Sequence, residues 1–315
     1  MRSAGAATGA RVLSRTALMI VNPHSRRGAG AHDAVRAALE GGGLSVLVRD
    51  CDGAEAIGRA IRESAGQVDR VVLGGGDGTL NAAAPALIET GLPLGVIPLG
   101  TANDLARTLG LPDDAAQAAA VVAAGRRRRI DMGEVNGQPF FNVASLGLGV
   151  DLTRALTRDA KRRWGVLGYA VAGLRVLRRL APFTAVIDDG TAEHRSRTVH
   201  ICVGNGRHYG GGMTVEADAT VDDGKLDFYS LEVAHWWRLI ALLPALRRGT
   251  HGRSEDVRAF STTEIVLRTK RPRPVNTDGE LTTSTPAHFK VMPKAVRIVA
   301  PPRSQRPGVP SPHPL

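Results

Sequence analysis

The chain contains 315 residues, of which 43% are apolar and 23% charged, so it is long enough for about two domains and too apolar to be wholly disordered. Its 41 Lys and Arg residues exceed its 30 Asp and Glu residues, and the net charge of +11 predicts phosphate-bearing partners such as a nucleotide, an anionic lipid or a nucleic acid. The two cysteines, Cys51 and Cys202, provide no disulfide framework and no cysteine-based zinc site, and Arg or Lys interrupts every apolar run before it reaches the length of a membrane span.

The part of the chain before Arg126 alternates strand-like and helix-like segments. Strands are predicted at 17–21, 44–48, 71–73 and 94–97, and helices at 31–39, 54–64, 80–88 and 104–109. This alternation predicts βαβ units and a parallel sheet whose loops gather at one edge. Ligands usually bind at that edge in such sheets.

The pattern changes after the four arginines of 126–129. Short strands are predicted at 185–187, 199–203, 225–231, 264–267 and 296–299, with one Leu- and Val-rich helix at 164–180. A second domain dominated by antiparallel β structure is therefore expected. The last segment, 301–315, is rich in proline and is predicted to be a disordered tail.

The strongest motif is the run Gly74-Gly75-Gly76-Asp77-Gly78-Thr79, which lies between a predicted strand and a predicted helix. Glycines let the backbone approach an anion closely, and the first amides of the following helix point at it, so the run is typical of a phosphate cradle. A lone carboxylate would repel phosphate, and Asp77 is therefore expected to face a divalent cation. The alternative is a tight turn with an Asp cap.

A second turn, 98–104, follows the next predicted strand and also opens a helix. Taken alone, Asn103 or Asp104 is more typical of a helix N-cap than of a ligand site. Taken together, the two adjacent turns predict one ligand site at the edge of the sheet.

With these turns and several later motifs, the sequence resembles the diacylglycerol kinase catalytic-domain family, which includes the sphingosine and ceramide kinases and the soluble bacterial lipid kinases. The matching motifs are Asn22-Pro23, GGDGTLN at 75–81, GTAND at 100–104, Phe141-Asn142 with Gly147 and Gly149, DDGKLD at 222–227, and Asp278-Gly279-Glu280. The GGDGT run by itself is less specific, because NAD kinases are similar there.

The resemblance implies a fold of two domains. An N-terminal doubly wound α/β nucleotide-binding domain is expected at 16–131 and a C-terminal antiparallel β-sandwich domain at 132–285. The segment 286–300 is expected to return to the first domain, and the ATP site is expected in the cleft between the two.

The resemblance also implies site residues. ATP would be lined by Asn22, Pro23, His24, Ser25, Arg26, Gly75, Gly76, Asp77, Gly78, Thr79, Leu80, Asn81 and Thr101. Asp223, with backbone oxygens near Thr220 and Lys225, would match the structural magnesium site of the family. Glu280 would be the general base, and a carboxylate that accepts the proton of the acceptor hydroxyl contributes roughly 10²–10⁴ to the rate.

The first loop departs from the family pattern, because Arg26 stands where the family usually has glycine. Two alternatives follow: Arg26 or Arg27 offers a guanidinium to phosphate in place of a backbone amide, or this loop holds ATP differently.

Three basic or aromatic segments are relevant to partners. The arginines of 126–129 are interpreted as cations that close an alanine-rich helix and face solvent, in preference to a lipid or nucleic-acid patch. Lys161-Arg162-Arg163-Trp164, with Arg175, Arg178 and Arg179, is the better candidate for membrane contact. Packing of this helix between the domains explains the same apolar positions about as well. Trp236-Trp237 fits either the core or a lipid-facing rim. Because only 4% of the residues are aromatic, no nucleic acid is expected as a partner.

These features predict an ATP- and Mg²⁺-dependent lipid kinase that phosphorylates a hydroxyl of a diacylglycerol-like or sphingoid lipid. We expect it in the cytoplasm, in peripheral contact with the inner face of the membrane. An NAD kinase is the alternative. A third possibility, an adaptor on a degenerate kinase fold, is disfavoured because Asp77, Asp104, Asp223 and Glu280 are all present.

Overall fold

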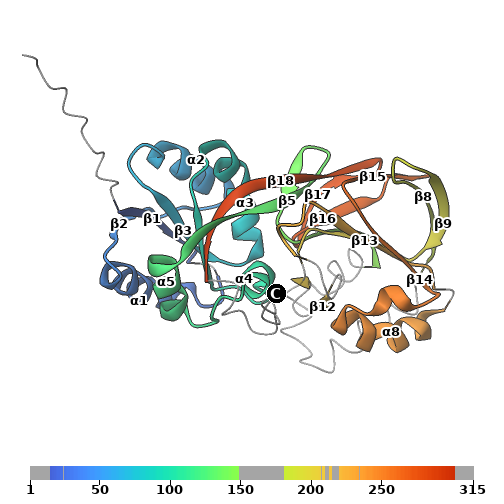
Figure 1. Ribbon diagram of the computed structural model, residues 1–315, viewed down its shortest axis with the longest axis horizontal. Helices are drawn as coiled ribbons and strands as arrows, with labels where there is room; N and C mark the ends of the chain where they lie inside the picture. Colours follow the sequence, from blue (N-terminus) through green and yellow to red (C-terminus); the bar gives the residue numbers. More distant parts are fainter. Residues whose placement is uncertain are drawn as a thin grey trace, which may run out of the picture.

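The computed structural model describes residues 15–23, 25–148, 181–206, 208–209, 213–214, 220–233 and 235–301. An α/β part at one end contains the N-terminal segments, and a mainly antiparallel β part at the other end contains the later ones (Figure 1). The predicted two-domain fold class is confirmed.

The α/β part is a parallel sheet covered by helices on both faces. Its strands pair in the order β2 (Ser45–Val48), β1 (Thr16–Val21), β3 (Arg70–Gly75) and β4 (Leu94–Pro98), and its helices are α1 (Gly28–Gly41), α2 (Ala54–Ser64), α3 (Asp77–Thr90), α4 (Asp104–Leu109) and α5 (Ala115–Ala124). Leu18 and Ile20 of β1 pack toward α2 and α3, whereas Ala17 and Met19 pack toward α1 and α5. Alternate residues of one strand thus enter both layers, as a doubly wound sheet requires.

The β part is a sandwich of two sheets. One sheet continues from β4 through β18 (Ala287–Ala300), β15 (Glu264–Thr269), β8 (Phe183–Asp188) and β9 (Glu193–Thr198), with β5 (Arg126–Val135) and β6 (Gln138–Phe140) beside β18. The other sheet has the order β14 (Val257–Thr262), β13 (Leu226–Leu231), β10 (His200–Gly204), β7 (Val143–Gly147), β16 (Pro274–Thr277) and β17 (Glu280–Ser284). Side chains from both sheets, such as Phe289 and Phe228, share one buried cluster.

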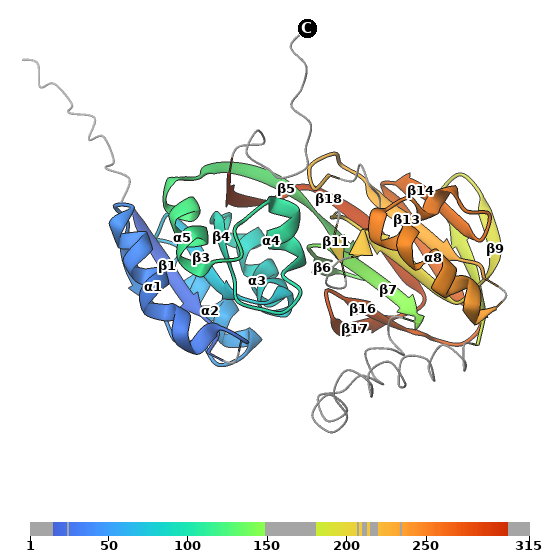
Figure 2. The ribbon, with the colours of Figure 1, turned by 90° about the horizontal axis from the view of Figure 1, so that it is seen from below.

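Three smaller features of the β part are also described. They are α8 (Trp236–Arg248), the short 3₁₀ helix η1 (His251–Arg253) and the small hairpin of β11 (His208–Tyr209) with β12 (Met213–Thr214). Leu239, Leu242 and Leu246 of α8 pack on the outer face of the second sheet, against Tyr229 and Leu231 of β13. Figure 2 shows α8 lying across β13 and β14.

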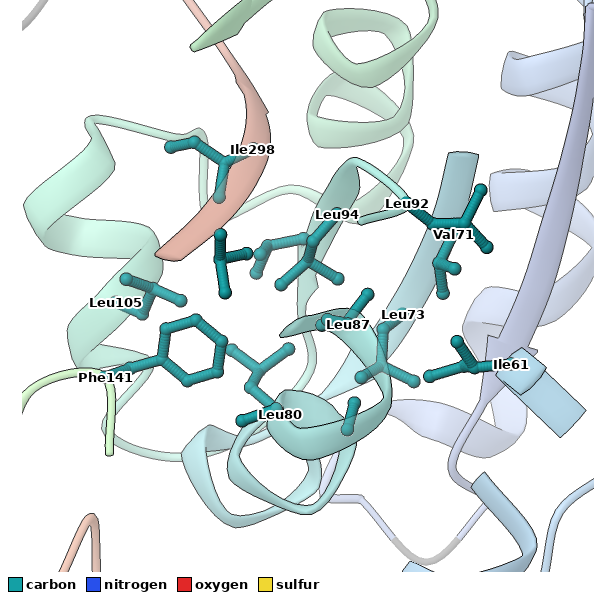
Figure 3. Close-up of a cluster of buried hydrophobic side chains, with 14 of the residues drawn as sticks. Ile61, Val71, Leu73, Leu80, Leu87, Leu92, Leu94, Leu105, Phe141 and Ile298 are labelled. Atoms are coloured by element: carbon teal, nitrogen blue, oxygen red, sulfur yellow. The ribbon is translucent and has the colours of Figure 1, made fainter. Parts of the chain in front are cut away.

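Two long strands run through both parts. β18 pairs with β15 at one end and, in parallel, with β4 at Ile298 and Val299, and β5 runs antiparallel beside it (Figure 1). Ile298 and Phe141 enter the core of the α/β part next to Leu80 and Leu105 (Figure 3). Full burial of each such side chain stabilises the fold by roughly 1.5–3 kcal/mol, so these contacts anchor the β part to the α/β part.

The arginines of 126–129 largely face solvent, as expected, but the interpretation that they close a helix is wrong. Helix α5 ends at Ala124, and the arginines begin β5, where they pair with residues 297–300 of β18. Arg127 donates to Asp69 at 2.7 Å, and Arg128 lies 3.6 Å from Asp222. The arginines are therefore held by a distant strand and by distant carboxylates, and not by the C-terminal end of a helix.

Several elements were not predicted, among them α8, β6, β7, β9, β14, β16 and β17. Cys202 is fully buried in β10, as expected, and burial raises the pKa of its thiol. The predicted helix at 164–180, the basic residues near Trp164, Gly149 and the tail beyond residue 301 lie outside the described residues. No described helix has both the length and the hydropathy needed to cross a bilayer.

Candidate active site

The loop after β1 is fastened to the glycine-rich turn after β3. The backbone N–H of Asn22 donates to the carbonyl of Gly74 at 2.8 Å, and its side-chain amide donates to Thr79 Oγ1 at 3.1 Å. Ser25 Oγ donates back to the Asn22 carbonyl at 2.7 Å. A Cβ on Gly28 would lie 2.2 Å from that same carbonyl oxygen, so the loop closes only with glycine there.

The two arginines of this loop differ in their surroundings. Arg27 donates to the carbonyl of Pro98 at 2.9 Å and to that of Asp113 at 3.0 Å, so it holds the loop to the turn after β4. Arg26 is exposed and is the better placed of the two for a phosphate. Pro23 is also exposed, and His24 lies outside the described residues.

The turns after β3 and β4 meet backbone to backbone. A Cβ on Gly100 would lie 2.5 Å from Gly76 Cα, and a Cβ on Gly76 would lie 3.3 Å from Gly100 Cα. Side chains at these glycines would force the turns apart, so the close contact requires glycine on both sides. Thr101 is exposed beside this contact.

The next two predicted ATP residues lie on α3. Leu80 is buried in the core of the α/β part, among the side chains shown in Figure 3. Asn81 is one helical turn after Asp77 and therefore on the same face of α3. Its Oδ1 atom is buried without a hydrogen-bond partner, which leaves an oxygen acceptor beside the turn.

Asp77 makes contacts that the sequence did not predict. Its carboxylate accepts the backbone N–H groups of Asp104 and Leu105, each at 3.2 Å, and so caps α4 from a different loop. It also accepts a hydrogen bond from Asn142 Nδ2 at 3.4 Å. The carboxylate thus joins the glycine-rich turn, α4 and the β part.

The cap of α4 differs from the expectation for Asn103 and Asp104. Asn103 occupies the N-cap position with a left-handed φ of 51°, but its side chain bonds the N–H and carbonyl of Gly100 at 2.9 and 3.2 Å. The Asn103 side chain therefore closes the turn after β4, and Asp77 caps the N-terminus of α4.

Glu280 reaches the glycine-rich turn from the β16–β17 hairpin. A Cβ on Gly78 would lie 3.0 Å from Glu280 Oε1, so this carboxylate stands over the first turn of α3. Glu280 itself is exposed, and the next residue, Leu281, is a large apolar side chain that is 48% exposed. The general-base candidate and the phosphate-cradle candidate thus lie against each other, although about 200 residues separate them in sequence.

The position of Glu280 depends on Asp278, to which the sequence analysis gave no role of its own. Asp278 is buried in a left-handed conformation (φ 48°), and its carboxylate accepts the N–H groups of Phe141, Asn142 and Val143 at 2.7–3.0 Å. Burial raises the pKa of Asp278 to about 7, and the nearby charge of Asp77 acts in the same direction, whereas the three N–H donors oppose it. In the sequence, the Asp278-Gly279 pair could have indicated the turn that presents Glu280, because Asp-Gly is typical of a tight turn.

The expected magnesium residues lie in the loop before β13. Asp223 is exposed, and its Oδ1 accepts the N–H of Lys225 at 3.0 Å. Asp131, buried in β5, holds the same loop through the N–H of Gly224 at 2.7 Å. One carboxylate with carbonyl oxygens near Thr220 and Lys225 would provide an all-oxygen donor set, the kind that suits Mg²⁺. Among the residues that the structure describes, no three His, Cys, Asp or Glu side chains gather as metal ligands.

Comparison with protein families gives two matches that together span most of the chain. Residues 16–135 match the diacylglycerol kinase catalytic domain, and residues 144–300 match the YegS C-terminal NAD kinase beta sandwich-like domain.

Individual relatives agree with these matches. A Klebsiella pneumoniae protein described as a probable lipid kinase YegS-like is 32% identical over 75% of this chain and 79% of its own length. A diacylglycerol kinase of Bacillus subtilis is 30% identical over 75% of this chain and 78% of its own length. The crystal structure of a putative diacylglycerol kinase from Bacillus anthracis has the same fold, with a TM-score of 0.80 at 24% identity over 94% of this chain and 98% of that one.

Asp278 predicts a pH dependence of stability. The folded-state pKa of Asp278, about 7, exceeds the ordinary value of about 3.9. The contribution of Asp278 to the free energy of unfolding is therefore fully present below about pH 4 and is lost as the pH rises through about 7. We expect the free energy of unfolding of the parent, measured in urea relative to Asp278→Asn, to fall over this pH range. A difference that stays constant from pH 4 to 8 would mean that the three N–H donors keep the carboxylate ionised throughout.

Proposed function

Since the chain belongs to the diacylglycerol kinase catalytic-domain family, which includes the YegS-like lipid kinases, we propose that it transfers the γ-phosphate of ATP to a hydroxyl of a diacylglycerol-like or sphingoid lipid. The observation that carries the proposal is the position of Glu280 over Gly78, at the start of α3. A phosphate held by the glycine-rich turn would have this carboxylate beside it. That is where a general base for an incoming hydroxyl is needed.

The phosphates of ATP are assigned to the turn at Gly75–Thr79. The first N–H groups of α3 lack partners within the helix, and they carry the positive end of its dipole. Asn22 and Ser25 support the turn from one side, and the exposed Arg26 and Thr101 lie on the neighbouring loops. Phosphoryl transfer needs mainly this positioning and the neutralisation of charge.

Glu280 accepts the proton of the lipid hydroxyl in the proposed reaction. Its carboxylate is exposed and therefore accessible to a substrate. The next residue of the same hairpin, Leu281, leaves a large apolar side chain exposed, which suits a lipid acceptor better than a soluble dinucleotide. The relatives are likewise described as lipid kinases, so the lipid is favoured over NAD as the acceptor.

Magnesium fits the residues at the start of α3. Asp77 and Asn81 share one face of the helix, and the buried Oδ1 of Asn81 has no hydrogen-bond partner. These oxygens would hold the ion, which when bound neutralises charge on the phosphates. Asp77 also keeps α4 and Asn142 in place through the contacts described above. A second, structural magnesium is proposed at Asp223 with the carbonyls of Thr220 and Lys225.

We place the protein in the cytoplasm, in peripheral contact with the membrane through α8. Trp237, Ile240 and Leu243 on the outer side of this helix are 53%, 48% and 39% exposed. Arg247 and Arg248 are exposed in its last turn, and the helix contains no acidic residue. Apolar and aromatic side chains beside cations are typical of a helix that lies in the interface of an anionic bilayer.

The acceptor is tested directly by incubating the purified protein with ATP, magnesium and either NAD or mixed micelles that contain diacylglycerol or a sphingoid base. Labelled phosphate is expected on the lipid, because the family and the apolar surface at Leu281 favour it. Phosphate on NAD, with none on either lipid, would overturn the proposal.

The two carboxylates at the turn should differ in their effects. Glu280→Gln is expected to lower kcat roughly 10²–10⁴-fold with little change in ATP affinity, because only proton transfer is lost. Asp77→Ala should remove nearly all activity and weaken ATP binding as well, because α4 loses its cap and the ion loses a ligand. Steady-state kinetics and calorimetric ATP titration measure both. An equal fall in ATP affinity in the two variants would contradict these roles.

Helix α8 gives a separate prediction. Trp237→Ser/Ile240→Ser should lower binding to vesicles of phosphatidylcholine and phosphatidylglycerol by at least about tenfold, because two large apolar side chains no longer enter the bilayer. Ala54→Ser/Ala120→Ser, at exposed positions of α2 and α5, is the matched control. Co-sedimentation at increasing salt measures the electrostatic part. Unchanged binding of the α8 variant would place the membrane contact elsewhere.

A further inference from the structure

A basic pocket lies on the outer face of the first sheet of the β part. Its residues come much later in the sequence than the glycine-rich turns. Its volume is about 600 Å³, and it is lined by strands β8, β9 and β15 and by the segment that follows β15. Five of its lining side chains are cationic: Arg195, Arg268, Lys270, Arg271 and Arg273.

The strand register explains why cations gather there. Val186 of β8 pairs with Arg268 of β15 on one side and with Arg195 of β9 on the other, so both arginines rise from the same face of the sheet. Lys270 and Arg271 follow directly as the chain leaves β15. The sheet thus forms the floor and the segment after β15 forms one wall.

Among the residues that the structure describes, the positive charge exceeds the negative charge around the pocket. Two carboxylates flank it, Asp188 and Glu193, and both pair with Arg268, at 3.4 and 3.2 Å. Lys270 and Arg271 are exposed, and Arg195 is exposed on the neighbouring strand. A concave surface with an excess of one sign concentrates the potential and attracts counter-ions.

The pocket also has an apolar side. Phe183 and Val186 belong to its lining, and the guanidinium of Arg273 lies 3.9 Å from the centroid of the Phe183 ring. This stacking holds the planar guanidinium in one orientation, which favours the two-point hydrogen bonding of a phosphate group. The combination suits a phosphate that is attached to a small organic group.

The basic pocket is separate from the site proposed for ATP. Arg273 immediately precedes β16, and its carbonyl accepts the N–H of Thr285 at the base of the β16–β17 hairpin. Glu280 lies at the other end of this hairpin, so the four residues of β16 separate the two by roughly 13 Å. A ligand in the pocket would contact the base of the hairpin that presents Glu280.

We infer that the basic pocket binds a phosphate-bearing anion, either the headgroup of an anionic lipid or free phosphate, at a site distinct from that of the nucleotide. The inference does not depend on the proposed reaction, because the register, the charges and the stacking exist whatever the chain phosphorylates.

The test is calorimetric titration with two probes, inorganic phosphate and dihexanoyl phosphatidic acid below its micelle concentration, at low ionic strength. Lys270→Gln/Arg271→Gln removes two exposed cations from the pocket and leaves the turn at Gly75–Thr79 unchanged. The matched control, Arg59→Gln/Arg253→Gln, removes two exposed cations elsewhere.

The parent and the control should bind at least one probe, and the pocket variant should bind it at least about tenfold more weakly. Equal loss of affinity for both probes identifies free phosphate as a sufficient ligand, and loss for the lipid alone identifies the headgroup. A pocket variant that binds both probes like the parent, or a parent that binds neither, would overturn the inference. Because catalysis is not measured, the result is independent of whether the proposed reaction is right.

The single variant Arg195→Gln on β9 is a control for a folding defect in the pocket variant. It should weaken binding of the same probe while leaving the thermal unfolding temperature close to that of the parent. Full affinity in this variant would likewise contradict the assignment.

Discussion

The arrangement at the proposed active site depends on Asn142, which lies between two carboxylates from different parts of the fold. Its side-chain amide donates to Asp77 at the start of α3, and its backbone N–H donates to Asp278 at the tip of the β16–β17 hairpin. Asp77 in turn caps α4, and Asp278 directly precedes Gly279 and Glu280. These two hydrogen bonds, at 3.4 Å to Asp77 and 3.0 Å to Asp278, link residues from both parts of the molecule. They set the distance between the glycine-rich turn and Glu280.

Continuous strands support this local network over a longer range. β5 and β18 run side by side through both parts of the molecule, and their side chains enter both hydrophobic cores. The α/β part supplies the turns assigned to the nucleotide, whereas Glu280, Leu281, α8 and the basic pocket all belong to the β part. The proposed reaction therefore divides between a part that holds phosphates and a part that faces the lipid.

The sequence predicted the fold class and most elements of the α/β part, because buried parallel strands and amphipathic helices leave local patterns. Helix α2, for example, has the expected bounds. The prediction at 126–129 was wrong, because these residues pair with a strand about 170 residues later although locally they resemble the end of a helix. Helix α8 was also missed, because its apolar residues occur on all sides and so give no clear period.

For the site, the sequence located the turns and Glu280 but not the contacts among them. The capping of α4 by Asp77 and the three N–H donors around Asp278 join residues that are far apart in the chain, and no local signal marks such pairs. The most direct test of the account is a crystal structure with β,γ-imido-ATP and magnesium bound. It should show the phosphates on the turn at Gly75–Thr79, with the Glu280 carboxylate facing the γ-phosphate from the β part. A nucleotide bound elsewhere, or a Glu280 turned away from its phosphates, would contradict it.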